Sequence, residues 1–192
     1  MTITPAILEP TYEHVTHKLF LLEGVTEWVQ IDLCDGIAGL EKTWLPYKEK
    51  HLPDGFSYEF DLMVKDWRKY VPRVIALGAK RIVVHVDSFS YDDISELIAM
   101  VAPHFIFLGL CGSNEGELKA FAEKVHHAEQ LYHKLFIQVM GIAKVGTQSQ
   151  PFDERVLKRI SYLRDHCRNI DIQVDGSMNP ETIFVVKEHD VR

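Results

Sequence analysis

The feature that most constrains the fold is a regular alternation between short apolar runs and segments with helical spacing. Seven runs of apolar or β-branched residues follow one another along the 192 residues: PAIL, WVQIDL, SYEFDLMV, RIVVHVD, FIFLGLCG, LFIQVMGI and IDIQVDG. Between them, residues 66–80, 92–102, 115–134 and 153–167 carry apolar side chains at helical spacing. Strands that alternate with helices indicate a parallel sheet.

Polar residues at the carboxyl ends of the runs distinguish the two architectures that such a sheet can take. An open doubly wound sheet gathers functional side chains at its switch point, whereas a (β/α)8 barrel collects them from all strands around one mouth. The polar residues at these ends are Asp32, Asp35, Asp61, His85, Asp87, Gln138 and Asp175. We therefore expect a TIM (β/α)8 barrel, an α/β fold formed by a single domain over residues 1–192.

An eighth strand should follow NPETIFVVKEHD, but the sequence ends at Arg192, so we expect a barrel with its last strand missing. Two unpaired sheet edges invite pairing with another copy, which makes a homo-oligomer one expectation. Asp92 or Asp93, Asn114 and Asp153 are predicted helix N-caps, and Gly78 is a predicted helix stop.

The composition argues against several classes of protein. A net charge of −7 disfavours a nucleic-acid face, which needs clustered Lys and Arg, but leaves room for a local anion pocket. Cys34, Cys111 and Cys167 are odd in number and widely spaced, unlike a disulfide framework or a structural zinc site. No run approaches the roughly 20 apolar residues of a membrane span, and no signal peptide is recognisable. We expect a cytoplasmic protein with no nucleic-acid or membrane partner.

Asp32 and Asp175 end the second and seventh runs, which would face each other across a barrel mouth. Two carboxylates around a small substrate can act as acid and base on opposite faces of one carbon. Crowding raises the pKa of one of them, so that one is protonated while the other is ionised. The alternative is that each aspartate caps a loop or a helix. Two matching Asp-Gly signals at strand ends favour a catalytic role for both.

Asp61 would join this pair from the third run, and Gln30 points to the same side of its strand as Asp32. For Asp61 alone, a capping role is again the alternative. Three carboxylates at one mouth repel one another unless a cation or a shared proton intervenes. Gln30, Asp32, Asp61 and Asp175 form an all-oxygen set, which suits Mg²⁺ or Mn²⁺ better than Zn²⁺. We expect these four residues to bind a divalent metal, and we expect no organic cofactor.

The loop from Met140 to Glu154 contains glycine and leads into a predicted helix. Backbone N–H groups in such a loop can hold a phosphate, and Lys144 would add a positive charge, although an ordinary connection is the alternative. Met63 and Met140 lie beside the expected mouth, where most methionines are core residues. His85 is expected to be a hydrogen-bonded interior histidine.

In this order, the motifs resemble those of the ribulose-phosphate 3-epimerase family from about Pro5 to Ile183. PAIL resembles the first strand, IDLCDG the family's DVMDG, DLMV its HLMV, VVHVDS its HxE-type strand and VDGSMNPETI its VDGG strand. VMGIAKVGTQSQPF is similar to the loop MTVNPGFGGQKF. The resemblance implies a TIM-barrel isomerase of the epimerase type that interconverts ribulose 5-phosphate and xylulose 5-phosphate, and hence a small phosphorylated sugar as its partner.

The resemblance also implies roles for individual residues. Asp32 and Asp175 match the acid–base pair that moves a proton at C3 through an enediolate. The implied substrate-binding residues are Met63 and Met140 beside the intermediate, Gly146 and Gln148 in the phosphate loop near Lys144, and Gly176 and Ser177 in a second phosphate turn.

Departures from the family pattern bear on activity. The family holds its metal with two histidines and two aspartates, whereas Gln30 and Asp61 stand at the histidine positions here, which disfavours tight Zn²⁺ binding. Glu9 replaces an expected serine, and AKVGT replaces PGFGG in the loop. The alternatives are therefore a catalytically inactive or regulatory homologue, or an epimerase or isomerase for a different sugar or sugar phosphate.

Overall fold

The structure is a computed structural model that describes residues 2–37, 41–47, 51–114, 116–143, 145, 149–189 and 191. Seven parallel strands form one sheet, and each strand pairs with the next one along the chain. The strands are β1 (Ala6–Ile7), β2 (Trp28–Cys34), β3 (Ser57–Met63), β4 (Arg81–His85), β5 (Phe107–Gly112), β6 (Leu135–Met140) and β7 (Asp171–Asp175). All seven predicted runs are therefore strands.

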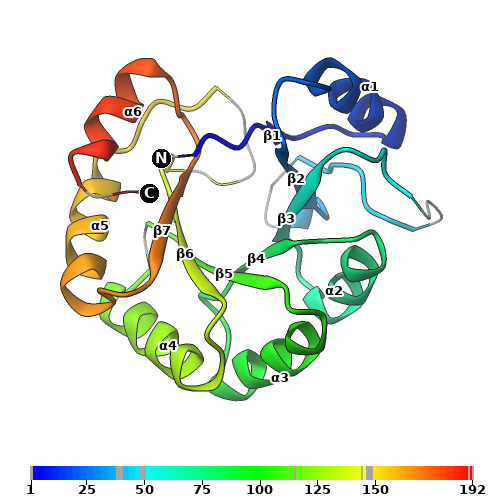
Figure 1. Ribbon diagram of the computed structural model, residues 1–192. Helices are drawn as coiled ribbons and strands as arrows, with labels where there is room; N and C mark the ends of the chain where they lie inside the picture. The colour runs from blue at the N-terminus through cyan, green and yellow to red at the C-terminus, as the bar shows by residue number, and fades with distance from the viewer. Residues whose placement is uncertain are drawn as a thin grey trace.

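The sheet curls on itself, and the helices lie around its outer side (Figure 1). They are α1 (Tyr12–Leu22), α2 (Trp67–Ala76), α3 (Tyr91–Val101), α4 (Leu118–Leu131), α5 (Arg155–His166) and α6 (Pro180–Lys187), with a 3-10 turn, η2 (Ala102–His104), after α3. β1 and β7 are the two edges of the sheet, and the ring stays open between them (Figure 1). The predicted TIM-barrel fold is confirmed, and seven strands fit a barrel whose last strand is missing.

Strict alternation along the strands gives the sheet two different faces. In β2, Ile31 and Leu33 point outward into the main apolar core, whereas Gln30 and Asp32 point inward. β2 and β3 are paired in register, with Gln30 beside Glu59 and Asp32 beside Asp61. The inner face therefore collects polar side chains at matching heights on neighbouring strands.

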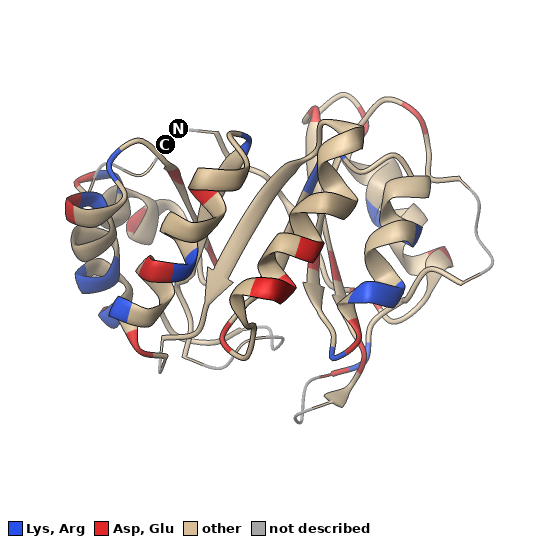
Figure 2. Ribbon diagram, turned by 90° about the horizontal axis from the view of Figure 1, so that it is seen from below, with Lys and Arg blue, Asp and Glu red and all other residues tan. Residues whose placement is uncertain are grey.

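The layer between the sheet and the helices is the main core. Leu19 of α1, Phe60 of β3 and Leu97 of α3 are fully buried in it. Each such side chain contributes about 1.5–3 kcal/mol by its burial, so this layer supplies most of the driving force for folding. Figure 2 shows acidic and basic residues interspersed on the outer helices. Within the described part of the chain, no helix has the length and apolar character that crossing a membrane requires.

The helix ends differ in part from the prediction. Gly78 follows the end of α2 with φ +87°, which confirms it as the stop signal. The N-caps predicted for α3 and α4 were wrong, because the N-cap positions of these helices are held by Ser90 and Glu117. At the start of α5, Asp153 Oδ1 accepts the Arg155 N–H at 3.1 Å, as an N-cap does. Asp93 instead completes a capping box with Ser90, and Asn114 donates its amide to the carbonyl oxygen of Met140 at 2.8 Å. Asn114 therefore ties two loops together rather than starting a helix.

Candidate functional site

The carboxyl ends of the strands surround a cavity of about 290 Å³ at the mouth of the barrel. Its lining includes six of the predicted site residues: Asp32, Met63, Met140, Asp175, Gly176 and Ser177. The chain thus brings together residues that lie more than 140 positions apart in sequence. The predicted Lys144, Gly146 and Gln148 lie outside the described residues.

Asp32 and Asp175 meet at a single amide group. Gln30 Nε2 lies 2.8 Å from Asp32 Oδ1 and 3.4 Å from Asp175 Oδ2, so the two hydrogens of one amide serve both carboxyl groups. Gln30 and Asp32 share a face because they are two residues apart on β2, and Asp175 approaches from the end of β7. The predicted pair is therefore placed around one point.

The protonation of this pair is set by its surroundings. Burial raises the pKa of Asp32 well above its ordinary value, and the negative charges of Asp175 and Asp61 raise it further. Burial also raises the pKa of Asp175, to about 6, and the charge of Asp61 adds to the shift. Hydrogen bonds from Gln30 oppose both shifts without cancelling them. Near neutral pH, the pair therefore favours a state with one shared proton over two charges.

Asp61 is wholly buried and has partners on both oxygens. Gln138 Nε2 donates to its Oδ2 at 2.7 Å, and His85 Nε2 lies 3.0 Å from its Oδ1. Burial lowers the pKa of His85, but its neighbours Cys111 and Asp61 outweigh burial and hold that pKa well above the ordinary value. Because burial keeps the Cys111 thiol protonated by raising its pKa, Asp61 is the partner that favours the imidazolium. The expected interior, hydrogen-bonded His85 is confirmed.

A layer of polar residues beneath the mouth was not predicted to belong to the site. Gln173 Nε2 donates to Glu59 Oε1 at 2.6 Å and to Gln138 Oε1 at 3.0 Å. Glu59 is fully buried, and Arg81 Nη1 reaches its Oε2 at 3.5 Å. The sequence does carry a signal for this layer, because Glu59 and Gln173 each stand two residues before a mouth aspartate, as Gln30 does.

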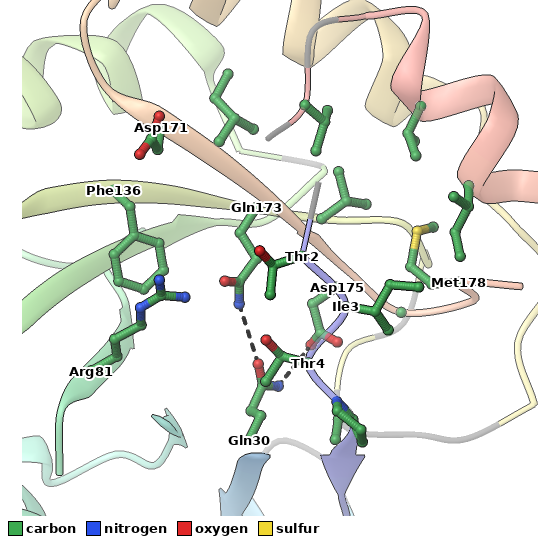
Figure 3. A pocket seen from close by; sticks show the side chains of 18 of the residues that line it. Thr2, Ile3, Thr4, Gln30, Arg81, Phe136, Asp171, Gln173, Asp175 and Met178 are labelled. Carbon is green, nitrogen blue, oxygen red and sulfur yellow. Dashed lines mark hydrogen bonds between the residues drawn. The ribbon is translucent and has the colours of Figure 1, made fainter. Parts of the chain in front are cut away.

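A second, larger cavity of about 610 Å³ opens between β7, α6 and the amino-terminal segment. Figure 3 shows Gln30, Gln173 and Asp175 at its centre, with Arg81 and Phe136 to the left of Gln173 and Thr2, Ile3 and Thr4 beside Gln30 and Asp175. Asp175 therefore borders the open side of the ring as well as the mouth. This cavity follows from the unpaired edges of β1 and β7.

The predicted metal site does not fit this arrangement. Gln30 turns its amide nitrogen, which cannot ligate a cation, toward Asp32 and Asp175. Both oxygens of Asp61 are already engaged by His85 and Gln138. Among the residues that the structure describes, no three His, Cys, Asp or Glu side chains are grouped to hold a metal ion. The expectation of Mg²⁺ or Mn²⁺ at Gln30, Asp32, Asp61 and Asp175 was based on residue types alone. Residue types do not reveal that Gln30 faces the two carboxyl groups with its nitrogen rather than its oxygen.

Seven curled parallel strands with outer helices and a carboxylate pair at their carboxyl ends define a TIM-barrel protein with an acidic site at its mouth. The model of the ribulose-phosphate 3 epimerase family matches residues 2–192. The chain belongs to this family, as the motifs suggested.

A crystal structure of 3-hexulose-6-phosphate synthase resembles the chain with a TM-score of 0.65 and 15% sequence identity, over 100% of this chain and 87% of the other. At this identity the likeness establishes the fold alone. No curated protein sequence shows a significant match to the chain.

Proposed function

We propose that the chain is an isomerase that moves the proton at C3 of a pentulose phosphate, with Asp32 and Asp175 as its acid–base pair. The observation that carries the proposal is the shared contact of both carboxyl groups with the amide of Gln30, at the wall of one cavity. Membership of the ribulose-phosphate 3 epimerase family supports the substrate class.

The proposed reaction needs one ionised and one protonated carboxyl group. The ionised aspartate takes the C3 proton from one face, the electron pair of the broken C–H bond forms the C2–C3 double bond, and the π pair of the C2 carbonyl moves onto its oxygen to give an enediolate. The protonated aspartate then delivers its proton to the opposite face of C3, which inverts that carbon and leaves the pair with its roles exchanged. The raised pKa values of Asp32 and Asp175 support this shared proton near neutral pH.

The cavity walls suit a small, planar intermediate. Met63 and Met140 are buried and line the mouth beside the two aspartates, so their thioethers would exclude water from the enediolate. Met63 Sδ lies 3.7 Å from the buried Cys34 Sγ, so a second sulfur packs behind this part of the wall. A low-dielectric wall on both sides slows the loss of the transferred proton to solvent.

We place the phosphate of the substrate at the turn formed by Gly176 and Ser177. Both residues have positive φ, at 90° and 57°, which turns the chain sharply between β7 and α6. Ser177 Oγ donates to the carbonyl oxygen of Gln150 at 2.9 Å, so this turn is joined to the loop after β6.

The test is proton exchange at C3 of ribulose 5-phosphate in deuterated water, followed by NMR. We expect deuterium at C3 and the appearance of xylulose 5-phosphate with the wild-type chain, and neither with Asp32→Asn or Asp175→Asn. Asp165→Asn, at an exposed position on α5, is the matched control and should behave as wild type.

A folded wild-type chain that exchanges no proton would overturn the proposed substrate. The same assay with other ketose phosphates and with unphosphorylated ketoses then separates an epimerase for a different sugar from a catalytically inactive homologue. Folding of each variant is checked by circular dichroism.

A further inference from the structure

We propose that three interior glutamines, Gln30, Gln138 and Gln173, hold the acidic mouth together in the place of a metal ion. In this arrangement Gln173 is a positioning residue that sets the orientation of the other two amides. The inference deepens the proposed function, and only its kinetic readout rests on that function.

The upper part of this network consists of amide hydrogens that point at carboxylates. Gln30 serves Asp32 and Asp175, and Gln138 Nε2 serves Asp61 at 2.7 Å. Gln30 and Gln138 are 2% and 0% exposed, so water does not compete for these contacts. Asp32, Asp61 and Asp175 thus each receive a hydrogen bond from an interior glutamine.

The side-chain amide of Gln173 fixes the orientation of the Gln30 and Gln138 amides. Gln173 Nε2 lies 3.0 Å from Gln138 Oε1 and 3.3 Å from Gln30 Oε1. Figure 3 shows Gln173 above Gln30, with Asp175 on the far side of the Gln30 amide. An amide whose oxygen accepts from one side must present its nitrogen to the other side, so Gln173 directs both nitrogens toward the mouth.

Gln173 is itself anchored by a buried carboxyl group. Its Nε2 lies 2.6 Å from Glu59 Oε1, the shortest contact in the network. Glu59 is 0% exposed, and its other oxygen faces Arg81, whose guanidinium lies 4.3 Å from the Trp28 ring centre. The amide nitrogen of Gln173 therefore serves three acceptor oxygens, those of Glu59, Gln138 and Gln30. Turning this amide over would remove the donor from all three.

This network is incompatible with a divalent ion at the mouth. To offer oxygen ligands, the amides of Gln30 and Gln138 would both have to turn over, which would place their nitrogens against the amide nitrogen of Gln173. Turning both would also leave Asp32 and Asp61 without their amide donors. The glutamines thus occupy the position and perform the holding role that a cation would have.

The first experiment follows the side-chain amide signals of the glutamines by ¹⁵N NMR during a titration with MnCl₂. We expect the Gln30 and Gln138 amide signals to keep their line widths at concentrations that broaden exposed acidic surfaces. Selective, saturable broadening of these two signals by Mn²⁺ would overturn the proposal. This measurement uses the wild-type chain and needs no turnover, so it decides the matter even where the proposed function fails.

The second experiment uses Gln173→Met, which keeps the length of the side chain and removes its donors. We expect the Gln30 and Gln138 amide signals to shift and to exchange faster with water, and kcat to fall about 10- to 100-fold with KM nearly unchanged. Gln130→Met, on the exposed side of α4, is the matched control and should leave both amides and kcat as in wild type. Unchanged Gln30 and Gln138 signals in folded Gln173→Met would show that Gln173 does not position them.

Discussion

The two faces of the sheet come from the same strands but differ in polarity: the outer face is apolar and much of the inner face is polar. The outer face of β2 and β3 carries Ile31, Leu33, Phe60 and Leu62, all buried in one apolar core. The inner face carries a polar network, joined on the β4–β6 side by a small apolar cluster around Phe136. Parallel strands are usually apolar on both faces, because helices cover one side and layers of branched side chains fill the other.

This difference indicates that the outer face determines folding stability and the inner face determines the chemistry of the site. Removing an outer-face side chain should cost folding stability and leave the site geometry intact, because that face packs into the apolar core with the helices and the segment between β2 and β3. Removing an inner-face polar group should instead change chemistry, hydrogen bonding or pH dependence. The variants below test that separation, in order of decreasing effect.

Asp32→Asn should have the largest effect, on activity alone. The substitution removes a proton-transfer group, and we expect C3 exchange to fall by about 10⁴-fold, the upper end for loss of general acid–base catalysis. Stability should stay the same or rise, because a buried carboxylate facing Asp175 and Asp61 is replaced by a neutral amide. Exchange rates and chemical denaturation measure the two quantities. A variant that loses stability and keeps its exchange rate would show that Asp32, on the inner face, serves folding and not catalysis.

Leu62→Ala should have the largest effect on stability. Leu62 is 1% exposed on the outer face of β3, and truncation there leaves a cavity between the sheet and the helices. We expect the free energy of unfolding to fall by about 2–5 kcal/mol, measured by urea denaturation. Since its neighbour Asp61 points to the other face, kcat below the unfolding transition should change less than threefold. A large loss of kcat in the folded variant would show that the two faces are coupled.

The outer face was predictable from sequence because its rules are local. Alternating runs predicted all seven strands, and helical spacing predicted α2, α3, α4 and α5. The helix α1 was missed, since only Val15 and Leu19 form its buried stripe, although Thr11 caps it at the His14 N–H. The N-caps of α3 and α4 were assigned to the wrong residues because several polar side chains near each of these helix starts can accept the same hydrogen bonds.

The sequence predicted the site residues that stand at strand ends, but not the hydrogen bonds that connect them. Asp32 and Asp175 could be paired because the carboxyl ends of parallel strands meet at one mouth. The role of Gln30 could not be predicted, because an amide offers an oxygen or a nitrogen and the choice depends on Gln173, 143 residues away. Glu59 was overlooked for a similar reason, since nothing local indicates that an acid in a strand is paired from two other strands.

Glu59→Gln should change how the stability of the protein depends on pH. Burial raises the pKa of Glu59 from 4.5 to about 7, so the folded state binds a proton there that the unfolded state has released. This group therefore favours folding below pH 4.5, and its contribution is lost as the pH rises toward 7 and beyond. The stability of Glu59→Gln relative to wild type should increase by about 3 kcal/mol between pH 4.5 and pH 8. Urea denaturation of both proteins across that range measures it, and a constant difference would mean that folding does not shift the pKa of Glu59.

Ser90→Ala should have the smallest effect, and it probes the outer layer without touching the sheet. Ser90 Oγ accepts from the Asp93 N–H at 3.1 Å, and the Asp93 carboxylate accepts from the Ser90 N–H at 2.8 Å, so the two close the amino end of α3. Alanine removes one half of this capping box, and we expect a loss of about 1 kcal/mol in the free energy of unfolding. The Gln30 and Gln138 amide signals should not move, because α3 packs on the outer side of the sheet. Movement of those signals would mean that a change at a helix end in the outer layer alters the interior glutamine network. The two faces of the sheet would then not be independent.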